Sequence, residues 1–261
     1  MSEFSILTPQ ATERIRPAPR RAEVLKARSL RSTVVLACAT VILTALVSGL
    51  VSHADDPPRA GDAANPLATS LGGLILAQLL IATLGALTVT SDHSSGSIRA
   101  TLIAFPRRGR LYEAKAEASA AAVGVVAVAT IFIAVLVSQI ILHGTEAALS
   151  TSTPHLLRSL VGSVYYLIGW GVAGFGIGAA VRRTAPAIGV LVVFQWVLPG
   201  VLSLYDLVLS NDIAPTATGQ ELLMNAAPHA GEPTVLGAAI FFTCFVVICL
   251  AVGWQSFRRN I

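Results

Sequence analysis

Apolar residues dominate six long stretches of the chain, and polar segments separate them. The stretches are Thr33–Val51, Pro66–Thr90, Ala118–Leu142, Ser159–Val181, Ala185–Tyr205 and Thr234–Phe257. An α-helix of about 20 residues crosses the roughly 30 Å hydrocarbon core of a bilayer, and each stretch is long enough to do so. None has a charged residue in its middle. The pattern predicts an all-α, polytopic membrane protein with six transmembrane helices, in which residues 33–257 form the transmembrane domain.

The composition excludes an ordinary soluble protein. Apolar residues make up 54% of the chain and charged residues 12%, against about 25% charged in a typical soluble domain. Sixteen of the eighteen lysines and arginines fall on one side of the predicted membrane. The positive-inside rule then places both termini in the cytoplasm. The chain is expected to be a multi-pass protein of the plasma membrane. The net charge of +4 is therefore interpreted as a topology signal, and no nucleic-acid partner is expected.

Three segments outside the spans have their own patterns. The N-terminal tail, residues 1–32, includes Arg20–Arg31, which has an amphipathic tendency and is expected to lie along the inner membrane face. The alternative is a basic flank that only fixes orientation. Residues 210–233 are expected to lie outside the cell and to form a small cap or short helices. Residues 258–261 are expected to be a short cytoplasmic tail.

Polar interruptions within the spans are few. Gln78, Gln139 and Gln195 are the long polar side chains at membrane depth. Such residues either hydrogen-bond between helices or face a solute pathway, and packing is the more common use. The three glutamines are thus candidates for lining a pathway, with helix packing as the alternative. Pro199 lies well inside the fifth span, where the missing backbone N–H predicts a kink.

The fourth span is rich in glycine. Gly174 and Gly178 have small-xxx-small spacing, which lets two helix backbones approach closely. Gly169–Gly174 also match the pattern GxGxxG, but a dinucleotide site needs a strand before the pattern and a helix opening after it. We therefore interpret this span as a packing face.

Candidate chemistry is sparse. All five histidines lie in connections, and the three cysteines lie within apolar spans. No metal-ligand spacing such as HExxH occurs, so neither a catalytic residue nor a metal site is expected. Spans without central charges also speak against coupling to protons or ions, which usually needs an ionisable residue inside the membrane.

The connection between the second and third spans, residues 91–117, is the most specific segment. At 27 residues it is long for a simple turn, and loops of this length are usually functional. Ile98, Leu102 and Phe105 recur at helical spacing before Pro106. A cluster of arginines follows. The pattern predicts a short amphipathic helix that docks a soluble partner; the alternative is a basic inner loop with no specific partner.

This connection resembles the first cytoplasmic loop of ABC-2 type transporter permeases, especially small six-span permeases of actinobacterial type. The shared pattern is an acidic residue, a glycine, Ile-Arg-x-Thr-Leu, Pro-Arg-Arg and a later lysine. Where the family more often has Glu followed by Tyr or Phe, this chain has Asp92-His93. The matching positions are Asp92, Gly96, Ile98, Arg99, Thr101, Leu102, Pro106, Arg107, Arg108 and Lys115.

The resemblance implies a permease subunit whose loop is a coupling helix seated in a separate ATP-binding subunit. ATP and Mg²⁺ would be bound by that partner, and this chain would hold no cofactor. Two permease subunits, identical or sister chains, would pair within the lipid bilayer. Most members of the family export their substrates. In keeping with this division of labour, no GxxxxGK phosphate loop occurs in the chain.

Other functions stay open at this point. They are an ion- or proton-coupled secondary transporter or channel, an intramembrane enzyme, and a membrane anchor for a signalling partner. The cargo of an exporter is open too, because the apolar spans suit a drug, an antibiotic, a lipid or a peptide equally well.

Overall fold

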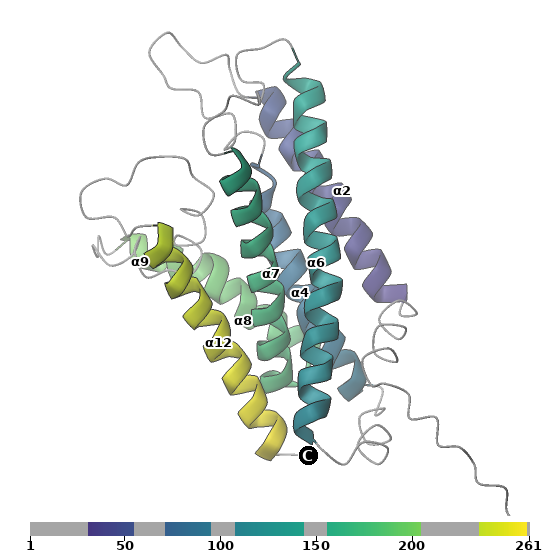
Figure 1. Cartoon of the computed structure of the whole chain (residues 1–261), viewed down its shortest axis with the longest axis vertical. Coiled ribbons are helices and arrows are strands. Elements are labelled where there is room, and N and C mark those ends of the chain that lie inside the picture. Colours follow the sequence, from purple (N-terminus) through teal and green to yellow (C-terminus); the bar gives the residue numbers. More distant parts are fainter. Residues whose placement is uncertain (1–30, 55–70, 95–107, 144–155, 205–234, 260–261) are drawn as a thin grey trace, which may run out of the picture.

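The computed structural model of the chain describes residues 31–54, 71–94, 108–143, 156–204 and 235–259. Every regular element in these ranges is helical, and six helices are long and apolar enough to cross a membrane. The predicted all-α architecture with six spans is confirmed. The elements, shown in Figure 1, are α2 (Arg31–Ala54), α4 (Leu74–Ser94), α6 (Arg108–Ile141), α7 (Leu156–Val181), α8 (Thr184–Val192), the π-helix η1 (Val193–Val197), α9 (Leu198–Leu204) and α12 (Val235–Arg259). The fifth span begins with α8 and continues without a break through η1 into α9.

The six spans run alternately up and down the bundle (Figure 1). We call the end where α4 ends and α6 begins the basic end. Of the lysines and arginines in the part of the chain that the structure describes, only Arg158 belongs to the opposite end. The positive-inside rule assigns the basic end to the cytoplasm, and this orientation stays a prediction.

Helix α7 lies at the centre of the bundle because its glycines let neighbours approach from two sides. A Cβ atom at Gly174 would lie 2.0 Å from the carbonyl oxygen of Ala82 on α4, and one at Gly178 would lie 2.9 Å from Ala86 Cα. On another side, a Cβ at Gly176 would lie 2.4 Å from the carbonyl oxygen of Cys249 on α12. Residues larger than glycine would push these helices apart.

Two helices extend further into the 91–117 connection than the sequence pattern predicted. Helix α4 continues to Ser94, and α6 begins at Arg108, so the connection between them shortens to residues 95–107. The charges of Arg108–Glu117 hid a helix whose buried side is formed by Leu111, Tyr112 and Lys115. With 34 residues, α6 is about 51 Å long, well above the thickness of the hydrocarbon core.

The fifth span is irregular near Pro199. The backbone N–H of Leu198 donates to the carbonyl oxygen of Val193, five residues earlier, and residues Val193–Val197 form the π-helix η1. The structure thus has a wide turn just before the proline, whose nitrogen cannot donate a hydrogen bond to the helix, and the kink itself stays a prediction. Gln195 lies on this wide turn and is buried.

Candidate functional site

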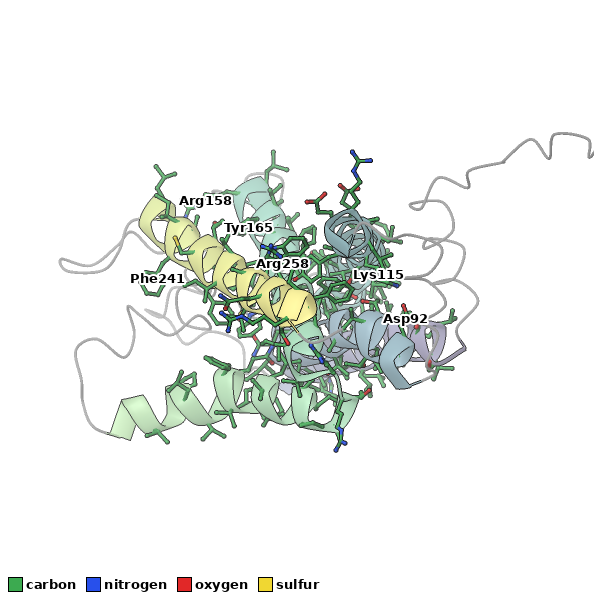
Figure 2. The ribbon with its side chains drawn as sticks, turned by 90° about the horizontal axis from the view of Figure 1, so that it is seen from below. Asp92, Lys115, Arg158, Tyr165, Phe241 and Arg258 are labelled. Carbon is green, nitrogen blue, oxygen red and sulfur yellow. The ribbon has the colours of Figure 1, made fainter. Side chains whose placement is uncertain are left out.

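The two ends of the 95–107 connection meet through a buried ion pair. Lys115 Nζ donates a hydrogen bond to Asp92 Oδ2, and the two side chains are 3% and 5% exposed, respectively. Asp92 lies in the last turn of α4 and Lys115 in the second turn of α6. Figure 2 views both residues from the basic end. Burying two charges costs desolvation energy that only close pairing offsets, so the pair fixes the start of the connection relative to its end.

Hydroxyl groups add further links around this ion pair. Thr90 Oγ1 lies 2.9 Å from Thr184 Oγ1 at the start of α8. Thr88 Oγ1 lies 3.1 Å from Ser119 Oγ on α6, and it also bonds to the carbonyl oxygen of Gly85. The last two turns of α4 are therefore joined to both α6 and α8.

A cluster of aromatic rings lies beneath these polar contacts. The Tyr112 ring centroid is 5.3 Å from that of Phe175 on α7, 5.3 Å from that of Trp254 and 5.6 Å from that of Phe257 on α12. Such ring pairs add stabilisation beyond the burial of their area. The Tyr112 hydroxyl also donates to the carbonyl oxygen of Leu250, at 2.9 Å. The first turns of α6 are in this way packed onto both α7 and α12.

Arg182 ties the end of α7 to the end of α12. Its φ of 65° places it in the left-handed region, where non-glycine residues are uncommon. Its guanidinium group donates to the carbonyl oxygen of Ser256 at 2.6 Å, and the Ser256 hydroxyl donates to the carbonyl oxygen of Ala180. The turn between α7 and α8 is thus held against the last turns of α12.

The residues of α4 and α6 among these form one connected cluster at the basic end, which we call the loop base. It joins α4 and α6 to each other and contacts α7, α8 and α12. Among the residues that the structure describes, no group of histidine, cysteine and carboxylate side chains is placed to hold a metal ion. The loop base comprises Thr88, Thr90, Asp92, Leu111, Tyr112, Lys115 and Ser119.

The predicted coupling residues fall into two groups. Asp92 and Lys115 are buried in the loop base, where they can position the connection but offer little surface to a partner. Arg108 is the first residue of α6. The remaining predicted residues lie outside the described ranges, as do residues 20–30 of the predicted interfacial helix and residues 210–233. These remaining residues are Gly96, Ile98, Arg99, Thr101, Leu102, Pro106 and Arg107.

Two of the three glutamines that were candidates for lining a pathway contact each other in the core. The Tyr166 hydroxyl donates to Gln78 Oε1, and Gln195 Nε2 donates to the backbone carbonyl of Gln78 at 3.3 Å. Both glutamine side chains belong to residues only 2% exposed, so in this conformation they link α4, α7 and η1 rather than line an open passage. Gln139 lies elsewhere, in the last turn of α6.

Sequence reasoning missed the two tyrosines that organise these clusters. Tyr112 and Tyr166 are both nearly fully buried. A buried tyrosine usually needs a hydrogen-bond partner for its hydroxyl group. A tyrosine in one apolar span and a glutamine in another are therefore a sequence signal for a hydrogen bond between the two helices. The pairing itself depends on which helices are neighbours, which hydropathy does not encode.

Comparison with models of known protein families and with characterised proteins finds no match for this chain. The six apolar helices and their basic end make it a multi-pass membrane protein.

Proposed function

We propose that the chain is the permease subunit of an ATP-driven transporter of the ABC-2 type and that residues 91–117 couple it to a separate ATPase subunit. The observation that carries the proposal is the buried Asp92–Lys115 pair. It joins the first and last positions of the loop pattern, so the two helix ends on which residues 95–107 are mounted are held together. A segment mounted in this way can transmit force from a soluble partner.

The packing around the loop base supports a path for that force. Movement of the 95–107 connection would act first on α4 and α6, which the ion pair joins. Tyr112 would pass it to α7 and α12, and the close contact at Gly174 keeps α4 and α7 moving together. Closure of two ATPase subunits on ATP and Mg²⁺ would thus tilt a pair of permease subunits between two states.

The absence of central charges in the spans supports an external energy source. The cargo would be a hydrophobic or amphipathic compound, and export is the expected direction. Two permease chains, identical or different, would form the pathway within the plasma membrane. ATP hydrolysis would take place on the partner, since the chain has no phosphate loop of the GxxxxGK type.

An ion- or proton-coupled transporter is the second candidate, because Asp92 and Lys115 are ionisable and buried. Such residues at membrane depth often mark coupling pathways. Two features favour the structural role: the two charges form an ion pair, and they lie in the last turn of α4 and the second turn of α6. In vesicles holding both subunits, transport driven by ATP without an ion gradient is expected, whereas transport driven by a gradient alone would favour this candidate.

Purification of the tagged full chain from its native membranes tests the coupling. We expect an ATP-binding cassette subunit to co-purify, and Arg99→Glu to reduce its yield several-fold because a cation in the loop pattern becomes an anion. Arg158→Glu, the same change at the opposite end of the bundle, is the matched control and should leave the yield unchanged. Recovery of the chain without any ATPase, or equal losses in both variants, would count against the proposal.

A further inference from the structure

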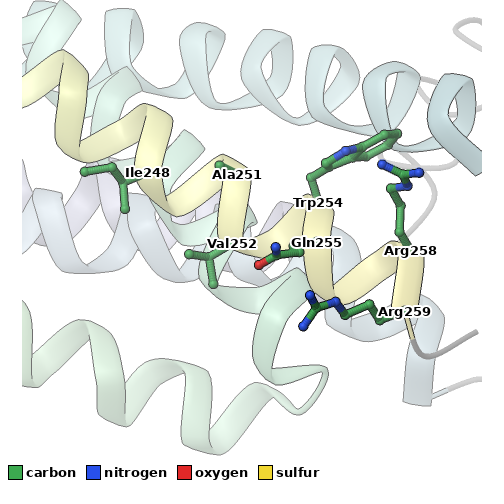
Figure 3. A pocket seen from close by; sticks show the side chains of 7 residues that line it. All are labelled: Ile248, Ala251, Val252, Trp254, Gln255, Arg258 and Arg259. Atoms are coloured by element: carbon green, nitrogen blue, oxygen red, sulfur yellow. The ribbon is translucent and has the colours of Figure 1, made fainter.

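A groove along the last turns of α12 combines cations with an apolar wall. It has a volume of about 680 Å³, and Figure 3 shows the side chains that line it. Two arginines lie at its basic end, and aliphatic residues lie deeper along the same helix. Its described lining residues all belong to α12: Ile248, Ala251, Val252, Trp254, Gln255, Arg258 and Arg259.

The charged half of the groove favours an anion. Arg258 and Arg259 are exposed, and neither forms an ion pair with a residue that the structure describes. Helix α12 has no acidic residue. Its C-terminal dipole corresponds to about half a negative charge, which two guanidinium groups exceed. Arg258 Cζ also lies 5.7 Å from the centre of the Trp254 ring, which is a cation–π contact between two residues of the groove.

The apolar half of the groove indicates how long its ligand is. Ile248 and Val252 are 61% and 51% exposed, and Figure 3 places both on the groove wall. From Ile248 to Arg259 the helix rises about 16 Å, close to half of the roughly 30 Å hydrocarbon core. A small soluble anion would use only the arginines, whereas a phospholipid would fill both halves.

We propose that this groove binds an anionic phospholipid of the adjacent leaflet. The headgroup phosphate accepts hydrogen bonds from Arg258 and Arg259, and the Gln255 amide is a further donor beside them. Trp254 lies at the level of the interface, where tryptophan is favoured, and an acyl chain runs along Val252 and Ile248. The proposal depends on the placement of the helices in a membrane and holds whether or not an ATPase partner exists.

Native mass spectrometry of the purified full chain tests this site. The chain is incubated with phosphatidylglycerol or with zwitterionic phosphatidylcholine, and the lipid retained is counted. We expect selective retention of phosphatidylglycerol, and about a fivefold loss of affinity for each cation removed in Arg258→Gln and Arg259→Gln. Arg258→Lys and Arg259→Lys keep the charge and should retain most of the binding, which separates lost recognition from misfolding.

Arg110→Gln is the matched control, since Arg110 is also an exposed cation at the basic end but lies on α6. Its retention of phosphatidylglycerol should equal that of the unchanged chain. Equal retention of both lipids, or an equal loss in Arg110→Gln, would overturn the proposal. So would a lipid-free dimer that Val252→Glu dissociates, because this face would then be a contact between two copies.

Discussion

Asp92 and Lys115 carry opposite charges, and they form an ion pair inside the protein. Both residues are buried, and the ion pair joins the last turn of α4 to the second turn of α6. In a medium of low dielectric an unpaired charge is strongly unfavourable, while a close pair is tolerated. The pair thus specifies which turn of α6 faces α4 more than it adds stability.

Removing one charge should therefore cost more than removing both. Asp92→Asn removes the carboxylate charge that is paired with the buried Lys115 ammonium, and we expect the free energy of unfolding in detergent micelles to fall by about 3–5 kcal/mol. Asp92→Asn combined with Lys115→Met should recover most of that loss. A double variant as unstable as the sum of the two single variants would show that charge complementarity is not what the pair supplies.

Tyr166 and Tyr165 are adjacent but their hydroxyl groups have different surroundings. Tyr166→Phe leaves Gln78 Oε1 without its donor in the core, and we expect a loss of about 1–3 kcal/mol. In Tyr165→Phe, the matched control, Thr243 keeps its own bond to the carbonyl oxygen of Ala239, so the loss should be smaller. The same unfolding measurement compares the two, and a larger loss in Tyr165→Phe would contradict the assigned role of Gln78.

At the scale of the elements, α7 determines how closely the bundle packs. Gly174 faces the backbone of α4, and Gly176 faces the backbone of α12. The small-xxx-small spacing predicted a packing face, but not which neighbours it serves, because the spacing has the same form whichever helix passes. Hydropathy likewise located α6 but not its start, since it treats the charged turns from Arg108 to Glu117 as a loop.

Two glycine substitutions separate close packing from helix propensity. A Cβ atom at Gly174 would lie 2.0 Å from a backbone oxygen, whereas one at Gly189 on α8 meets nothing within 4 Å. We expect Gly174→Ala to lower the free energy of unfolding by about 1–3 kcal/mol. Gly189→Ala should raise it by about 0.5–1 kcal/mol through better helix propensity. Thermal unfolding in detergent measures both, and a neutral Gly174→Ala would mean that α4 and α7 separate without cost.

At the scale of the whole molecule, hydropathy and charge predict the six spans and their alternation because both are summed over about 20 residues. Hydropathy and charge along the sequence do not predict the loop base. Tyr112 meets Trp254 and Phe257 across more than 140 residues of chain, and only the packing of α6 against α12 brings them together. The loop pattern did point to Asp92 and Lys115, but as contacts for a partner rather than as partners of each other.

We propose that residues 91–117 couple the chain to an ATPase, and photo-crosslinking in intact cells can detect that contact. A photoreactive residue is placed at Arg99 in the loop pattern and, as the matched control, at Arg158 at the opposite end of the bundle. We predict a covalent adduct between an ATP-binding cassette subunit and position 99, and none with position 158. The absence of such an adduct at position 99, or adducts of equal yield at both positions, would contradict the claim.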